Sequence, residues 1–169
     1  MKSLESIYNS ILLENQNPNN IDLKLLKKCV VGTYNINDNG SVDVKGDVNL
    51  NRKNLTKIPF KFRNVSGYFS CGDNQLTSLE GAPESVGMSF YCGSNNQLTT
   101  LEGAPRIVRY DFNCLNNPNL PYSELFKIVD RVKGDIYYSK IIPEDKDKIR
   151  RDRDVKSILK DDELGDLDV

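Results

Sequence analysis

The sequence predicts an α/β repeat fold, a short solenoid of about four to five rungs with one strand per rung. A phrase recurs with a period of 21–22 residues: Phe69-Ser70-Cys71, then Phe90-Tyr91-Cys92, then Phe112-Asn113-Cys114. An Asn and then a Leu follow each copy, and Leu-x-x-Leu with Gly-Ala-Pro completes the two full copies. Because a unit this short cannot bury its apolar side alone, stacked copies must share one core.

The chain divides into four regions around this repeat. Residues 1–46 are expected to form an N-terminal cap of helices and a β-hairpin, and residues 47–120 the solenoid. Residues 121–142 are expected to form a C-terminal cap of helix and strand. Residues 143–169 are expected to form a charged helical tail.

The N-terminal cap begins with two amphipathic segments. Apolar residues recur at helical spacing over residues 3–13, and a second helix is expected over residues 21–30. Residues 31–44 predict a hairpin, because Asp38-Asn39-Gly40 is a turn signal between alternating apolar positions. We expect this hairpin to pair onto the first rung at residues 47–50.

Alternation along each strand assigns the side chains of a repeat to two faces. Phe69 and Cys71 point to the core, whereas Tyr68 and Ser70 point outward. Val86 and Val108 are expected to close the core before the next strand. A ladder of buried amides that satisfies the turn backbone is expected from Asn74, Asn95 and Asn117. Lys53 occupies the ladder position of the first repeat, so the ladder should begin one rung later.

Three of the four cysteines share one core position in successive repeats: Cys71, Cys92 and Cys114. Their spacing matches no zinc-binding pattern. A disulfide between neighbouring rungs is one alternative, since adjacent strands lie close enough. Free buried thiols that act as small hydrophobes are the favoured reading, and they suit a reducing cytoplasm.

After the repeats, residues 121–132 predict a helix, and residues 135–138 predict a strand that protects the open edge of the last rung. The tail from residue 143 mixes charges of both signs. One reading makes its basic residues a nucleic-acid patch: Lys148, Arg150, Arg151 and Arg153. A solvated helix face is favoured, because acidic residues interleave with them.

The phrase Phe-x-Cys-x-x-Asn-x-Leu from Phe69 to Leu76 resembles the signature of the leucine-rich-repeat family, with Phe and Cys in Leu positions. The motif NQLTSLEGAP resembles the repeats of short-repeat proteins encoded by large tailed bacteriophages. The resemblance covers residues 31–140 and implies a binding scaffold, with no implied activity. Lys53 departs from the pattern in the first repeat.

No catalytic residue, cofactor site or metal site is expected. The chain contains no His to act as a base near neutral pH, and it carries no Walker A, Gly-x-Ser-x-Gly or dinucleotide motif. A formal net charge of -1 argues against nucleic-acid and membrane partners. The sequence has no apolar run of membrane-spanning length and no signal peptide, so we expect a cytoplasmic protein.

A partner-binding site is expected on the concave strand face of the solenoid. The face is acidic, bears tyrosines and has no Lys or Arg, which favours a protein partner over a phosphate backbone. Its outward residues by alternation are Asp47, Asn49, Tyr68, Ser70, Ser89, Tyr91, Asp111, Asn113, Asp135 and Tyr137.

The sequence thus predicts a non-enzymatic protein-interaction module, a phage accessory protein that binds a host protein in the bacterial cytoplasm. The alternative is a virion protein packaged through its N-terminal segment. Leu12-Leu13-Glu14 resembles the site at which the prohead protease of large tailed phages cleaves, after Glu14. An ordinary capping helix is the favoured reading of that segment.

Overall fold

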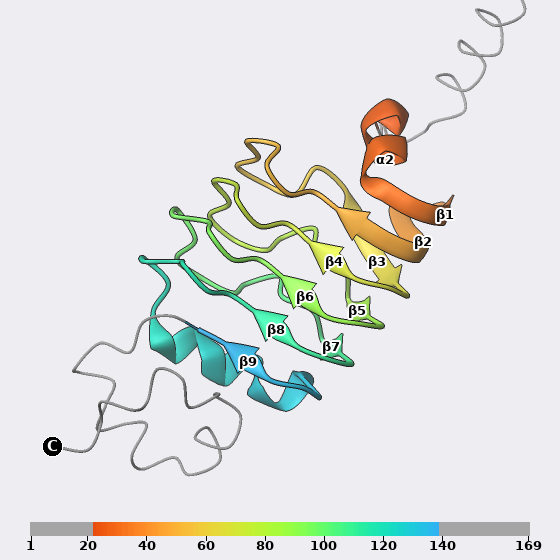
Figure 1. Ribbon diagram of the computed structural model, residues 1–169. Coiled ribbons are helices and arrows are strands. Elements are labelled where there is room, and N and C mark those ends of the chain that lie inside the picture. The colour runs from red at the N-terminus through yellow and green to blue at the C-terminus, as the bar shows by residue number, and fades with distance from the viewer. Residues whose placement is uncertain (1–21, 139–169) are drawn as a thin grey trace, which may run out of the picture.

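The computed structural model describes residues 22–138, which form a parallel β-solenoid of about five turns (Figure 1). The predicted helix over residues 3–13, the tripeptide Leu12-Leu13-Glu14 and the charged tail from residue 143 lie outside the described residues. The short predicted helix before the hairpin is present as α2 (Leu23–Cys29). Asp22 caps it by accepting a hydrogen bond from the Leu25 amide at 2.9 Å.

The predicted hairpin is confirmed as β1 (Val30–Ile36) and β2 (Ser41–Asn49), paired antiparallel from Val30 opposite Val48 to Ile36 opposite Val42. The sequence predicts that this hairpin pairs onto a separate strand of the first rung, and that prediction is wrong. Instead, β2 continues to Asn49 and is itself the strand of the first turn. Gly46, at φ +137°, lies within β2, and a Cβ there would lie 2.0 Å from the Val31 carbonyl oxygen.

Each full turn contains two short strands, so the prediction of one strand per rung is wrong. The first half of β2 pairs with β3 (Lys61–Val65), followed by β5 (Ser85–Val86) and β7 (Ile107–Val108). We call β3, β5 and β7 the valine ladder. The extended backbone around Val65, Val86 and Val108 hydrogen-bonds to the next turn, whereas the sequence indicated only core-closing side chains there.

The second half of β2 leads into the other ladder, which we call the phenylalanine ladder. It consists of β4 (Phe69–Ser70), β6 (Phe90–Tyr91), β8 (Phe112–Asn113) and β9 (Ile136–Tyr137), all parallel. These four strands lie side by side along the solenoid in Figure 1. The strand expected at residues 135–138 is thus present as β9.

The core between the ladders is a stack of equivalent side chains. Phe69, Phe90 and Phe112 are fully buried, and their rings stack at 5.3 and 5.0 Å between centroids. All four cysteines are free and buried, as favoured from the sequence. Burial raises the pKa of the Cys71 and Cys92 thiols well above their ordinary value, and that of Cys114 to about 12.

The predicted amide ladder is confirmed. Asn95 donates to the carbonyls of Cys71 and Cys92 at 3.1 and 3.0 Å, and its oxygen accepts from the Leu76 amide at 3.0 Å. One turn later, Asn117 donates to the carbonyls of Cys92 and Cys114, and its side-chain oxygen accepts from the backbone N–H of Asn95. Lys53 occupies the position of the ladder Asn in the first turn, and its side chain is exposed. Its backbone N–H donates to the side-chain oxygen of Asn74 at 3.0 Å.

Residues 121–132 fold as 3₁₀-helices rather than as the expected longer helix. The two segments are η1 (Tyr122–Lys127) and η2 (Val129–Arg131). Their i to i+3 bonds include Ile128 N–H to Leu125 at 3.0 Å. Leu125 and Ile128 are buried three residues apart, and the three-residue period of a 3₁₀-helix keeps both against the core.

Candidate protein-binding face

The outer surface of the phenylalanine ladder is a flat array set by strand register. Ser70, Tyr91, Asn113 and Tyr137 lie in one row, because each residue pairs with its equivalent in the next turn. Asn49 extends this row at the first turn. The inward neighbours in each strand are buried, so the row is held on a rigid support. Its members are half-buried or exposed.

A second predicted row runs beside the first and consists of Asp47, Tyr68, Ser89, Asp111 and Asp135. Three of these side chains hold the backbone of the following turn. Asp47 accepts from the Tyr68 amide at 2.8 Å, Ser89 from the Asp111 amide at 3.2 Å and Asp111 from the Asp135 amide at 3.0 Å. Ser89 is only 4% exposed, so it offers little surface to a partner.

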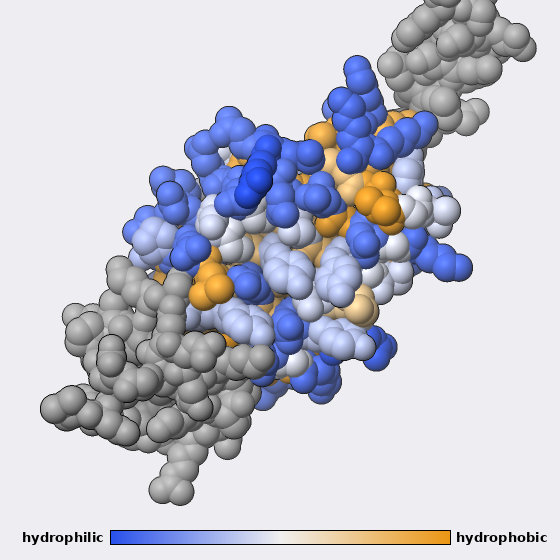
Figure 2. All heavy atoms as spheres, in the orientation of Figure 1, coloured by the Kyte–Doolittle hydropathy of each residue, from blue (hydrophilic) through white to orange (hydrophobic). Residues whose placement is uncertain are grey.

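Tyr68 and Tyr91 are brought together by the register. Their ring centroids lie 6.2 Å apart with planes inclined by 32°, and Tyr68 is 41% exposed. Figure 2 views this side of the molecule and shows moderately polar side chains over the middle of the solenoid, with strongly hydrophilic ones around them. Such a pair of rings offers a large, stiff contact area at low entropic cost.

Tyr110, which strand alternation did not assign to the face, is 53% exposed. It lies just before the strand β8, where the chain turns from one ladder to the other, and its carbonyl accepts from the Gly134 amide at 3.1 Å. The only signal in the sequence was a tyrosine one residue before the expected outward position Asp111. The strand period does not apply at a corner, so alternation assigned it no face.

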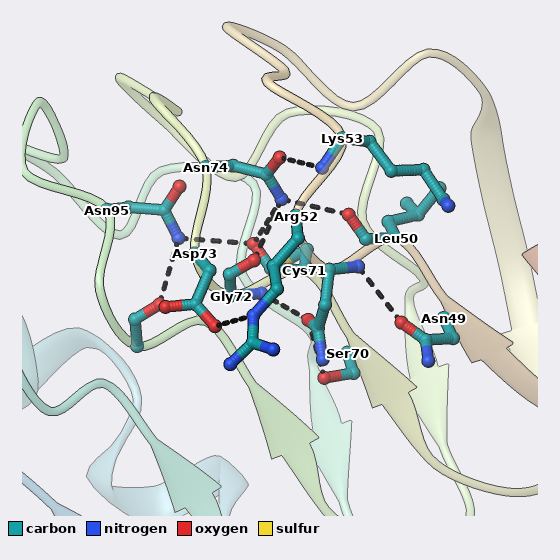
Figure 3. A network of polar contacts seen from close by, with 12 residues as sticks. Asn49, Leu50, Arg52, Lys53, Ser70, Cys71, Gly72, Asp73, Asn74 and Asn95 are labelled. Carbon is teal, nitrogen blue, oxygen red and sulfur yellow. Dashed lines mark hydrogen bonds and ion pairs between the residues drawn. The ribbon is translucent and has the colours of Figure 1, made fainter.

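One edge of the face is formed by the turns that follow the strands (Figure 3). Ser70 donates its hydroxyl to Asn51 at 2.8 Å, and the Gly72 amide donates to the same Asn51 oxygen at 2.7 Å. Arg52 forms an exposed ion pair with Asp73 at 3.0 Å, and Asn74 and Asn95 of the amide ladder lie to one side of it in Figure 3. The predicted face therefore has a cation at its rim, but this cation is paired.

The described residues include possible metal ligands and nucleophiles. Within residues 22–138, no group of three or more metal-ligating side chains is placed to hold an ion. The cysteine thiols lie in the core and are held in their neutral form, whereas a nucleophilic cysteine requires an accessible thiolate. Among the same residues, no helix is long and apolar enough to cross a membrane.

No known protein family, curated protein or solved structure matches this chain.

Proposed function

We propose that this chain is a non-enzymatic interaction module that binds a protein partner through the outer face of the phenylalanine ladder. The observation that carries the proposal is the Tyr68–Tyr91 ring pair on the outer face of the sheet, in which Tyr68 is exposed and Tyr91 is half-buried in the row that also contains Ser70 and Asn113. Tyrosine among small polar residues is the composition of protein-binding surfaces.

The proposal includes the finer assignment of the repeat as a variant of the leucine-rich repeat. The inward Phe and Cys positions and the Asn ladder support it, whereas the valine ladder is an addition to the expected repeat. The hairpin β1–β2 with α2, and the η1 segment, would then act as caps at the two ends. At the second end, Glu124 supports this role by accepting from Thr100 and from the Leu101 amide, both at 2.8 Å.

The partner that we propose is a bacterial host protein, and the support is the resemblance of the NQLTSLEGAP segment to repeat proteins of large tailed phages. The experiment begins with affinity capture from bacterial lysate by the tagged full chain, followed by purification of the captured protein and measurement of its Kd. We expect Tyr68→Glu with Tyr91→Glu to weaken binding by about 30-fold or more, the loss typical of a hot-spot pair.

The control is Ile107→Glu, which places one glutamate, rather than two, on the valine ladder at a residue that is 46% exposed. This variant should bind with unchanged Kd, and all variants should keep a cooperative unfolding transition. Equal affinity of the tyrosine double variant and the unchanged chain would refute the proposed face.

The virion alternative is favoured by a single feature, an amphipathic segment that ends in the tripeptide Leu12-Leu13-Glu14. It stays a prediction with a direct measurement. Mass spectrometry of purified particles should detect a peptide that begins at Asn15 if the segment is a packaging signal. Absence of the protein from particles would remove this alternative and leave the interaction module.

A further inference from the structure

A groove of about 540 Å³ lies on the side of the molecule formed by the valine ladder. Along the floor of the groove lie the corners at which successive turns leave this ladder. At these corners the Ser66 amide donates to the Val44 carbonyl at 3.0 Å, and the Gly87 amide donates to the Val65 carbonyl at 2.8 Å. The backbone amides of Arg109 and Lys133 form the equivalent bonds in the next two turns. We call this line of residues the corner row: Lys45, Ser66, Gly87, Arg109 and Lys133.

A glycine keeps the middle of the corner row open. A Cβ at position 87 would lie 2.1 Å from the Ser66 carbonyl oxygen, so the backbones of adjacent turns approach too closely for a side chain. Ser66 on one side is small, and the next long side chain along the row is Arg109. The groove is therefore an open trough with a cationic side chain at either end, Lys45 and Arg109.

The charges around the trough do not cancel. Lys45, Arg109 and Lys133 are exposed, and none of them forms an ion pair within residues 22–138. Asp43 is the one carboxylate in the lining, and it is already held by the Arg63 guanidinium and by the Asn64 amide at 3.0 Å. The uncompensated charge in the groove is consequently positive.

The rest of the lining suits an extended peptide. Thr33, Ser66 and Ser85 provide hydroxyl groups, and the half-buried ring of Tyr34 contributes apolar surface. Three separated cations form too few phosphate contacts for tight binding of nucleic acid. An acidic chain segment with interspersed apolar residues fits both the charge and the lining.

The chain itself contains such a segment. Residues 161–169 read DDELGDLDV, with acidic residues at 161, 162, 163, 166 and 168, no Lys or Arg, and leucines at 164 and 167. It begins 23 residues after Tyr138 (161 minus 138), and an extended chain of that length spans roughly 70 Å. Five turns at about 4.8 Å each are much shorter, so the segment can reach the whole corner row.

We propose that residues 161–169 dock in the groove of their own chain, with the acidic side chains against Lys45, Arg109 and Lys133. The tether supports binding within one molecule, because it keeps the segment at an effective concentration in the millimolar range. This inference goes beyond the proposed function: it concerns the valine ladder, and it holds or fails independently of the tyrosine face.

The test is an NMR comparison of full-length chains by their backbone amide resonances. Neutralising the segment by Asp161→Asn, Asp162→Asn, Glu163→Gln, Asp166→Asn and Asp168→Asn should shift the resonances of Asn64, Ser66, Ser85 and Gly87. Those of Ser70, Tyr91 and Asn113 on the other ladder should stay in place. The matched control neutralises five other acidic residues (Glu144→Gln, Asp145→Asn, Asp147→Asn, Asp152→Asn and Asp154→Asn) and should leave the groove resonances unchanged.

A charge reversal in the groove provides the second half of a double-mutant cycle. Arg109→Glu should release the segment, so that neutralising residues 161–169 in this variant shifts Ser66 and Ser85 no further. A shift that disappears on dilution would assign the contact to a second copy of the chain and overturn docking within one molecule. Unchanged groove resonances on neutralisation would overturn the proposal outright, and a response to added inorganic phosphate would then point to a phosphate-bearing partner.

Discussion

The two ladders of the solenoid share their repeat and their parallel pairing but differ in what they bury and what they present. The phenylalanine ladder buries stacked rings and presents tyrosine, serine and asparagine. The valine ladder buries one valine per turn and presents charges that alternate in sign from Arg63 to Glu84 to Arg106. A single core thus supports two surfaces of different chemistry.

The difference also concerns how each ladder holds its register. Beside the phenylalanine ladder, the buried amides of Asn74 and Asn95 join successive turns. The valine ladder shows no equivalent buried side-chain network within residues 22–138, and its turns are joined by backbone bonds such as Glu84 N–H to Arg63 at 2.8 Å. Register therefore depends more on side chains in the first ladder and more on the backbone in the second.

The largest expected effect contrasts the two buried side chains. Phe90→Ala removes a ring that stacks on two others and should lower the free energy of unfolding by about 3–5 kcal/mol. Val86→Ala removes two methyl groups from the other ladder and should cost about 2 kcal/mol. Urea denaturation measures both, and equal losses would mean that the ladders contribute equally to the core.

A change in the amide ladder sharpens the comparison. Asn95→Ala leaves the Leu76 amide without its acceptor and removes one of the two side-chain donors to each of the Cys71 and Cys92 carbonyls, so it should cost about 2 kcal/mol. Lys53→Ala, at the equivalent position of the first turn, should change the free energy of unfolding by less than about 0.5 kcal/mol, because its side chain is exposed. Similar urea midpoints for the two variants would argue against a stabilising amide ladder.

The corner between the ladders offers a third test. Gly87→Ala places a methyl group against the Ser66 carbonyl oxygen and should cost about 2 kcal/mol, as the turns must separate. Ser85→Ala, two residues away and half-buried, is the control and should be nearly neutral. Thermal unfolding followed by circular dichroism compares them; a neutral Gly87→Ala variant would show that adjacent turns tolerate a wider corner.

The smallest effect concerns the charged exterior of the valine ladder. The hydrogen bond from Arg63 lowers the pKa of Asp43 from 3.8 to about 2. The folded-state pKa lies below the ordinary value, so the ion pair stabilises the fold above about pH 4 and is lost as pH falls toward 2. Because the pair is largely solvated, its contribution should stay below about 1 kcal/mol.

Asp43→Asn should remove this part of the acid dependence while leaving stability at pH 7 within the same limit. Stability curves from pH 2 to 7 for both chains provide the measurement. Superimposable curves over the acid range would show that the pair contributes nothing to folding.

The sequence by itself determined the repeat, its inward positions and the amide ladder. These features follow from side chains that must be buried at a fixed period, as with Phe90 and Asn95, and burial patterns are visible in one dimension. It also determined the hairpin, since Asp38-Asn39-Gly40 encodes its turn locally.

Only the tertiary structure decided which backbone segments pair between turns. The valine ladder arises because neighbouring turns align extended peptides around Val65 and Val86, and one buried valine per turn does not distinguish a paired strand from a loop. The same alignment placed Tyr68 against Tyr91, exposed Tyr110 at a corner and gathered Lys45 and Arg109 around one groove. Such neighbours lie about one or more repeat lengths apart in the chain, and only stacking brings them together.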